Sequence, residues 1–159
     1  AARITDNAFA VVSDPDIDIV VELIGGYTVA KDLILAAIEN GKHVVTANKA
    51  LLATHGNEIF AAARARGVMV AFEAAVAGGI PIIKALREGL TANRIEWVAG
   101  IINGTSNFIL SEMRDKGLAF DAVLQEAQRL GYAEADPTFD IEGIDAAHKL
   151  TIMAAIAFG

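Results

Sequence analysis

Short apolar runs alternate with segments of helical periodicity along the first half of the chain. Residues 18–24, 43–46 and 68–72 are rich in β-branched and other apolar side chains, which is typical of buried strands. Residues 28–40 and 58–66 carry apolar side chains at helical spacing, and a glycine follows each segment as a helix-ending signal. Strands and helices that alternate at such short spacing predict an α/β fold with a parallel sheet.

The pattern changes after the third predicted strand, where glycine and polar residues interrupt the apolar runs. We expect a glycine-rich turn with a helix at residues 76–89 and a strand at residues 95–102. A polar turn at residues 103–107 precedes a helix, and a further helix is expected at residues 120–130. We therefore place a domain boundary near residue 75, which divides the chain into residues 1–75 and residues 76–159.

The composition excludes several classes of protein. The 159 residues are 54% hydrophobic, enough for a sizeable core, and the net charge of −7 without a basic run argues against a nucleic-acid partner. The chain has no cysteine, which excludes disulfides and thiolate metal sites, and its histidines lack zinc-ligand spacing. No apolar run reaches the roughly 18 residues that span a membrane. No signal peptide is visible, so we expect a cytoplasmic protein.

Both ends of the chain resemble positions within a longer protein. It begins at Ala1 rather than at a methionine, and it ends at Gly159 within an apolar pattern. We therefore expect a fragment that is truncated at both ends. The dinucleotide fingerprint G-x-G-x-x-G is absent, so in a dinucleotide-binding fold the strand that carries it would lie upstream of Ala1.

The densest charge lies in residues 131–149. This segment holds five carboxylates and one lysine, namely Glu134, Asp136, Asp140, Glu142, Asp145 and Lys149. Asp145 and Lys149 are four residues apart and share a helix face, which continues into the apolar Ile152 and Ile156. Burying charge is costly unless the charge is paired or used. Two interpretations stay open: an exposed salt bridge worth about 0.2–0.5 kcal/mol, and a lysine placed for proton transfer.

Other candidates follow the carboxyl ends of the predicted strands, where parallel sheets bind ligands. Gly25 and Gly26 could let the backbone approach a cofactor pyrophosphate, or form only a tight turn. Lys49 could contact a phosphate, nicotinamide or substrate, or be a surface lysine. Glu73 could join backbone carbonyls around a hard cation, although spacing by itself favours an acid at a helix start. Asn103 begins a polar turn that suits an anion, or in which Thr105 or Ser106 caps the helix that follows.

Five segments together resemble homoserine dehydrogenase, in its monofunctional form rather than its fusion with aspartokinase. They are VVELIGG (20–26), HVVTANKALLA (43–53), EAAVAGGIPIIKALREGL (73–90), GIINGTSNFIL (100–110) and GYAEADPTFDIEGIDAAHK (131–149). The resemblance covers essentially the whole chain, and the last three segments in this order are highly specific.

The resemblance implies a partial Rossmann-type dinucleotide-binding domain in residues 1–75, followed by an incomplete α+β domain for catalysis and dimerisation in residues 76–159. It implies interconversion of L-homoserine and L-aspartate 4-semialdehyde with NADP or NAD, on the route to threonine and methionine. A monovalent cation (sodium or potassium) and a homodimer or homotetramer are also implied. The alternatives are a Rossmann-type dehydrogenase for another amino acid and a non-catalytic dimerisation fragment.

The resemblance also implies roles for the charged segment. Lys149 matches the proton donor and acceptor at the substrate oxygen, with Asp145 one helical turn before it as a second catalytic candidate. Glu134, Asp140 and Asp145 match acids of the substrate pocket. With these assignments, the charged segment of residues 131–149 is interpreted as part of a substrate site.

Further matches concern the cofactor and the cation. Lys49 and Gly131 match positions that line the cofactor, and Gly25 joins them as part of the turn after the first predicted strand. Four residues match the monovalent cation site, three of them through backbone carbonyls: Glu73, Val76, Gly78 and Ile80. The resemblance therefore favours the cation interpretation of Glu73 over the helix acid.

Overall fold

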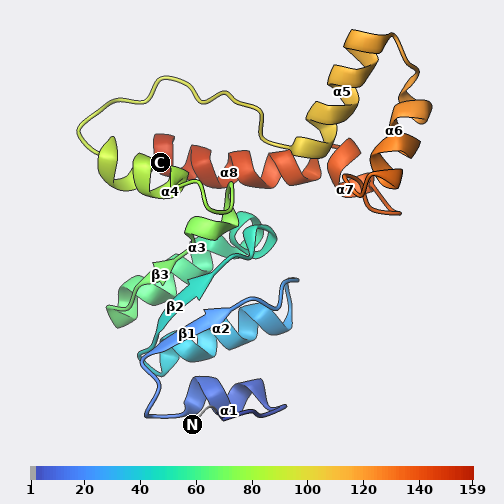
Figure 1. The fold of residues 1–159 in the computed structure, drawn as a ribbon. Coiled ribbons are helices and arrows are strands. Elements are labelled where there is room, and N and C mark those ends of the chain that lie inside the picture. The colour runs from blue at the N-terminus through green and yellow to red at the C-terminus, as the bar shows by residue number, and fades with distance from the viewer. Residues whose placement is uncertain (1–2) are drawn as a thin grey trace.

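A computed structural model describes residues 3–159 and contains a three-stranded parallel sheet whose strands are connected by helices. Along the chain, the sheet elements and the helices between them are β1 (Ile19–Glu22), α2 (Val29–Glu39), β2 (His43–Thr46), α3 (Lys49–Arg66) and β3 (Val70–Ala71). The strands lie in the order β1-β2-β3, each parallel to the next (Figure 1). The predicted parallel α/β arrangement is therefore confirmed.

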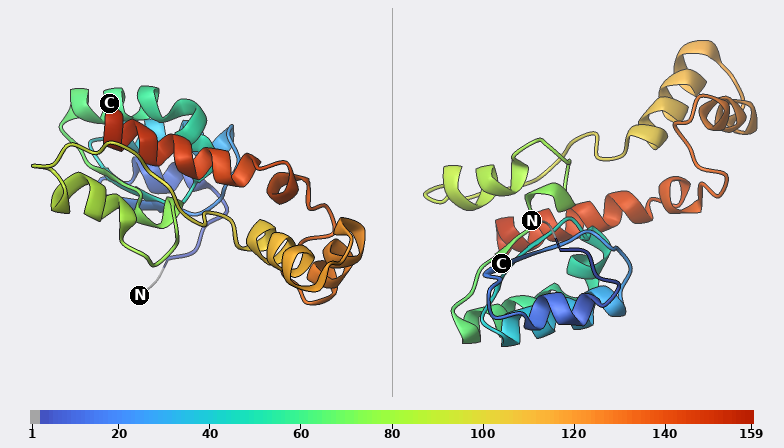
Figure 2. Two further views of the ribbon diagram at one scale, coloured as in Figure 1. Left: turned by 90° about the horizontal axis from the view of Figure 1, so that it is seen from above. Right: turned by 60° about the horizontal axis from the view of Figure 1, so that its bottom comes forward.

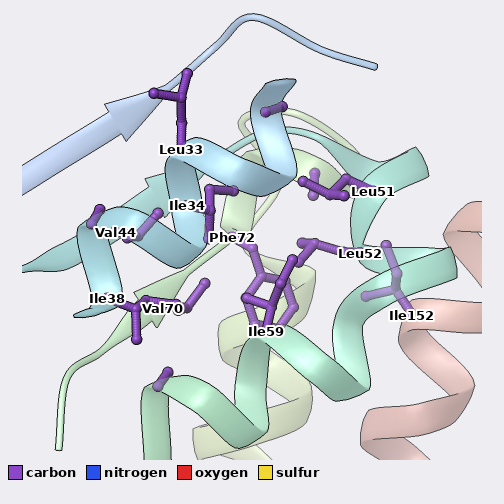
Figure 3. Close-up of a cluster of buried hydrophobic side chains, with 14 of the residues drawn as sticks. Leu33, Ile34, Ile38, Val44, Leu51, Leu52, Ile59, Val70, Phe72 and Ile152 are labelled. Atoms are coloured by element: carbon purple, nitrogen blue, oxygen red, sulfur yellow. The ribbon is translucent and has the colours of Figure 1, made fainter. Parts of the chain in front are cut away.

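The main core fills the space between the sheet, α2 and α3. Its buried side chains include those labelled in Figure 3: Leu33, Ile34, Ile38, Val44, Leu51, Leu52, Ile59, Val70, Phe72 and Ile152. Each buried leucine or isoleucine contributes about 1.5–3 kcal/mol relative to an exposed one. Because Ile152 belongs to α8 (Ile144–Phe158), the same core fixes the C-terminal helix against α3.

The remaining elements lie around α2 and the two ends of α8. They are α1 (Ala8–Ser13), the 3-10 turn η1 (Glu73–Ala75), α4 (Ile82–Lys84), the π-helical turn η2 (Ala85–Gly89), α5 (Gly104–Lys116), α6 (Phe120–Arg129) and α7 (Thr138–Ile141). Helices α5, α6 and α7 form a lobe that projects away from the sheet in Figures 1 and 2. The lobe has its own small core around Ile109 and Val123. No helix formed by residues 3–159 is long and apolar enough to cross a membrane.

Helix α3 begins earlier than the sequence predicted. It starts at Lys49 rather than at residue 58, because the Asn48 side chain caps it by accepting a first-turn backbone N–H at 3.2 Å. Gly56 obscured the helical pattern, since an internal glycine costs about 1 kcal/mol relative to alanine. In the structure Gly56 lies against Phe60, whose ring a Cβ would meet at 3.4 Å. Close packing therefore offsets the low propensity.

The strand predicted at residues 95–102 is wrong. These residues are assigned to neither a strand nor a helix, and within residues 3–159 no strand pairs with them. The apolar pattern that suggested a strand leaves Trp97 74% and Ile101 78% exposed. A strand forms only where a neighbour satisfies its backbone N–H and C=O groups. Helices α1 and α7 were not predicted, because elements this short show no complete period.

Candidate active site

The predicted ion pair forms in the first turns of α8. Lys149 Nζ lies 2.7 Å from Asp145 Oδ2, and it also donates a hydrogen bond to the carbonyl oxygen of Ile102 at 3.0 Å. Asp145 is only 5% exposed. The interpretation as an exposed surface salt bridge is therefore excluded, and the carboxylate sits inside the protein.

A second lysine and an amide also hold Asp145. Lys49 Nζ lies 3.0 Å from Oδ1, and Asn103 Nδ2 donates a hydrogen bond to Oδ2 at 2.9 Å. Burial by itself would raise the pKa of Asp145, but hydrogen bonds from Lys149, Asn103 and Lys49 outweigh burial and lower that pKa to about 2. Asp145 therefore stays charged at neutral pH and holds two ammonium groups side by side.

Lys49 reaches this cluster from the edge of the sheet. It is the first residue of α3 and follows closely on the carboxyl end of β2. Its Nζ also lies 5.7 Å from the centre of the Phe139 ring of α7. The sequence placed Lys49 at the strand edge but did not place it against Asp145, because no local pattern encodes a contact between such distant segments.

Asn103 joins two acids and a helix start. Its Nδ2 donates to Asp140 Oδ1 at 2.8 Å as well as to Asp145, while its Oδ1 accepts the backbone N–H of Ser106 at 2.7 Å. The turn caps the helix as expected, but the capping side chain is Asn103 rather than Thr105 or Ser106. The Ser106 hydroxyl donates to the backbone carbonyl of Asp140 at 3.1 Å. Asp140 thus lies beside Asp145, as a shared pocket requires.

Glu134 and Gly131 are on the loop between α6 and α7, and within residues 3–159 no hydrogen bond joins them to this cluster. Gly131 follows α6 with a φ of +77°, and Glu134 is exposed. The loop is held through its backbone, since Gln128 Nε2 donates to the Glu134 carbonyl oxygen at 3.0 Å. Asp136, which had no role assigned from sequence, accepts hydrogen bonds from the N–H and hydroxyl of Thr138, the first residue of α7, at 3.1 and 2.6 Å.

The carboxyl edge of the sheet carries a second polar network. Gly25 and Gly26 have φ of +82° and +75°, and a Cβ at either would meet no atom within 4 Å. The buried Glu22 holds this turn, because Oε1 accepts two backbone N–H groups at 2.7 and 3.0 Å and Oε2 accepts the Thr46 hydroxyl at 2.7 Å. Asn48 Nδ2 donates to the Gly26 carbonyl at 2.8 Å. The turn is thus fixed, with open space above its glycines.

The carboxylate of Glu73 caps α4. Its two oxygens accept backbone N–H groups of that helix at 2.8 and 2.9 Å, as the helix-acid interpretation requires. Within residues 3–159, no hydrogen bond reaches the carbonyl oxygens of Val76 and Gly78, whereas the Ile80 carbonyl accepts one at 2.8 Å. In the same part of the chain, no group of three or more His, Cys, Asp or Glu side chains could hold a metal ion. Any cation here would depend on backbone oxygens.

A cavity of about 1040 Å³ lies away from both polar networks. It opens between α3, β3 and the C-terminal half of α8, and many of its lining side chains are apolar, among them Phe60, Phe72 and Ile156. None of the residues assigned to the site lines it. The polar networks, rather than this cavity, mark the candidate site.

Two family models match almost the whole chain. The model described as homoserine dehydrogenase, NAD binding domain, matches residues 1–73, and the model described as homoserine dehydrogenase matches residues 81–159. The chain belongs to the homoserine dehydrogenase family. The resemblance carried by the five sequence segments is therefore confirmed.

Individual homoserine dehydrogenases are close to this chain. The one from Pseudomonas aeruginosa is 76% identical over 100% of this chain, and the one from Neisseria gonorrhoeae is 69% identical over the same share. In both comparisons the chain spans 37% of the relative's length.

Solved homoserine dehydrogenases share the fold. The Thiobacillus denitrificans structure has 82% identity and a TM-score of 0.94 over 98% of this chain and 36% of its own. A hyperthermophilic archaeal homoserine dehydrogenase in complex with NADPH has 31% identity and a TM-score of 0.88, over 98% of this chain and 48% of its own. The arrangement of the sheet, the lobe and α8 is thus shared within the homoserine dehydrogenase family.

Proposed function

We propose that this chain is part of an NAD(P)-dependent oxidoreductase that interconverts L-homoserine and L-aspartate 4-semialdehyde. The observation that carries the proposal is the buried Asp145 with two lysines around it, in a chain of this family. The cluster adjoins the glycine turn, since Asn48 contacts that turn and the next residue, Lys49, contacts Asp145. These contacts support a proton donor beside a cofactor-binding edge.

Lys149 is the proposed proton donor and acceptor. In the direction of reduction its ammonium group donates a hydrogen bond to the aldehyde oxygen and then transfers a proton to that oxygen as it becomes a hydroxyl. A nicotinamide cofactor, when bound, supplies the hydride that the carbonyl carbon receives. In the direction of oxidation, neutral Lys149 takes the proton from the substrate hydroxyl. Asp145, 2.7 Å from Nζ, orients the ammonium group and stabilises its charge between turnovers.

Three acids are proposed to bind substrate. The substrate carries an ammonium group, for which a carboxylate is the natural charge-assisted partner. Glu134 suits this role because it is exposed on the loop between α6 and α7. Asp140 and Asp145 lie together through Asn103 and complete the acidic side of the pocket.

NADP or NAD is proposed to lie along Gly25, Lys49 and Gly131. The glycine turn supports this placement, because its left-handed backbone and the open space above it permit a close approach to a pyrophosphate. Lys49 offers a positive charge at the same edge. The match of residues 1–73 to an NAD binding domain supports a nicotinamide dinucleotide in general.

We propose a sodium or potassium ion at Glu73, Val76, Gly78 and Ile80. The oxygens present fit a singly charged, hard cation, because the Val76 and Gly78 carbonyls are not used by hydrogen bonds within residues 3–159. The Glu73 carboxylate caps α4, and its backbone carbonyl accepts the Val76 N–H at 3.3 Å, so the Val76 and Gly78 carbonyls carry this proposal.

Several wider proposals rest on the family resemblance. We propose that the domain boundary lies near residue 75, dividing residues 1–75 from residues 76–159, which agrees with family matches that stop at 73 and resume at 81. We propose a cytoplasmic protein that assembles as a homodimer or homotetramer. We also propose a role in threonine and methionine biosynthesis.

Turnover by the complete protein tests the function. The protein is assayed with L-homoserine, and separately with L-serine, by following NADPH or NADH formation. One missing methylene reduces kcat/KM by about 10–200-fold in a fitted pocket, so homoserine should be preferred by at least that margin. Absence of turnover with homoserine and both cofactors would overturn the proposal, and an equal rate with serine would overturn the substrate assignment.

A further inference from the structure

We propose that Asn103 is a positioning residue, which fixes the two substrate-pocket acids Asp140 and Asp145 relative to Lys149. The inference rests on the proposed function and deepens it. Asn103 comes from the turn before α5, Asp140 from α7, and Asp145 and Lys149 from α8. One side chain thus links the three elements that must keep a common geometry during the reaction.

The hydrogen bonds of Asn103 use both ends of its amide. Nδ2 donates to Asp140 at 2.8 Å and to Asp145 at 2.9 Å, while Oδ1 accepts the N–H of Ser106 at 2.7 Å. A primary amide has two N–H donors, and both are engaged by carboxylates. Asn103 therefore acts through the acids rather than by contacting substrate itself.

A neutral donor suits this position because the surrounding charges balance. Lys49 and Lys149 both contact Asp145, so the two acids and the two lysines sum to zero charge. A cation in place of Asn103 would make the pocket positive and oppose the substrate's ammonium group. An acid would place three carboxylates together, and their repulsion would favour protonation. An amide bonds both acids and leaves the charge unchanged.

The start of α5 contacts the charged segment at further points. The Thr105 hydroxyl donates to the Tyr132 carbonyl at 2.7 Å, and the Ser106 hydroxyl donates to the Asp140 carbonyl at 3.1 Å. These bonds fix the loop that carries Glu134 to the same helix start. Asn103 is the member of this group that reaches α8, and so it connects the lobe to the proton donor.

Asn103→Asp in the complete protein tests the proposal. The aspartate keeps an oxygen that caps α5 but loses both N–H donors and adds a negative charge. We expect kcat/KM for homoserine to fall about 10- to 100-fold, since hydrogen bonds to charged groups are lost, while the Kd for NADPH stays unchanged. Asn7→Asp is the matched control, because Asn7 caps α1 through a bond to the Ala10 N–H and is exposed.

The pH profile separates positioning from a general loss of structure. Asp145 faces Lys49, Lys149 and, through Asn103, Asp140, so a third carboxylate beside it raises the pKa of Asp145. The acid limb of kcat/KM should therefore move to higher pH in Asn103→Asp and stay in place in Asn7→Asp. Parental kcat/KM and an unmoved acid limb in folded Asn103→Asp would overturn the proposal.

A neutral variant keeps the test decisive if Asn103→Asp does not fold. Serine at this position can still cap α5 but cannot reach both acids, so Asn103→Ser should show the same fall in kcat/KM with an unchanged Kd for NADPH. Parental kcat/KM in Asn103→Ser would overturn the proposal. Homoserine turnover by the parent protein tests the proposed function separately, and its absence would overturn that function. If the parent protein is active and both Asn103 variants keep its kcat/KM, only the role of Asn103 is overturned.

Discussion

Replacing Asp145 by asparagine measures what its buried charge contributes to stability. Asparagine has nearly the same size but lacks the charge that faces Lys49 at 3.0 Å and Lys149 at 2.7 Å. The pKa of Asp145 is about 2 in the folded protein, against an ordinary value of 3.8. At about 1.4 kcal/mol per pKa unit, this difference corresponds to about 2 kcal/mol of folding free energy at neutral pH.

The contribution has a defined dependence on pH. Because the folded pKa lies below the unfolded value, ionised Asp145 stabilises the folded state above pH 3.8, and this stabilisation is lost as the pH falls toward 2. Asp145→Asn should therefore be less stable than the parent protein by about 2 kcal/mol at neutral pH. The difference should narrow below about pH 4, where the parent protein loses the same charge.

Urea unfolding at a series of pH values, followed by circular dichroism, measures this difference. Asp115→Asn is the control, since Asp115 pairs with Arg114 at 2.7 Å on an exposed surface where solvent screens the charges. The control should change stability little at any pH. An Asp145→Asn variant as stable as its parent at neutral pH, or a deficit that is the same at every pH, would refute the reasoning.

Two further substitutions test the cofactor edge and the docking of α8. In the parent protein the Glu22 carboxylate accepts two backbone N–H groups and the Thr46 hydroxyl, and Glu22→Gln replaces it by an amide. The Kd for NADPH, measured by fluorescence titration, should therefore rise about 10-fold. An unchanged Kd would contradict the role of this turn in cofactor binding. Ile152→Ala leaves a cavity under α8 and should cost about 2–5 kcal/mol in urea unfolding. The exposed Ile4→Ala should cost almost nothing, and equal losses would show that the core does not hold α8.

The sheet was predictable because its signals are local. Three apolar runs and the segments between them were enough to indicate parallel strands, and β1, β2 and β3 lie within those runs. The strand expected at residues 95–102 failed for the complementary reason. Strand formation depends on a partner elsewhere in the chain, which the apolar pattern of one segment does not reveal.

The site was only partly predictable. The pairing of Asp145 with Lys149 follows from helical spacing, and the structure confirms it. The contacts of Lys49 and Asn103 with Asp145 join segments distant in sequence, and no periodicity encodes them. Glu22 also went unnoticed, because an acid at the end of an apolar run gives no sign that it bonds the following glycine turn.

Replacement of Lys149 tests the central claim most directly. Lys149→Ala is compared with the parent protein and with Lys84→Ala, in which an exposed lysine 3.9 Å from Glu88 is removed instead. Loss of the proton donor should lower kcat for homoserine by about 10²–10⁴-fold and leave the Kd for NADPH within twofold of the parent, while Lys84→Ala keeps parental kcat. Near-parental kcat in Lys149→Ala, with cofactor bound normally, would contradict the account.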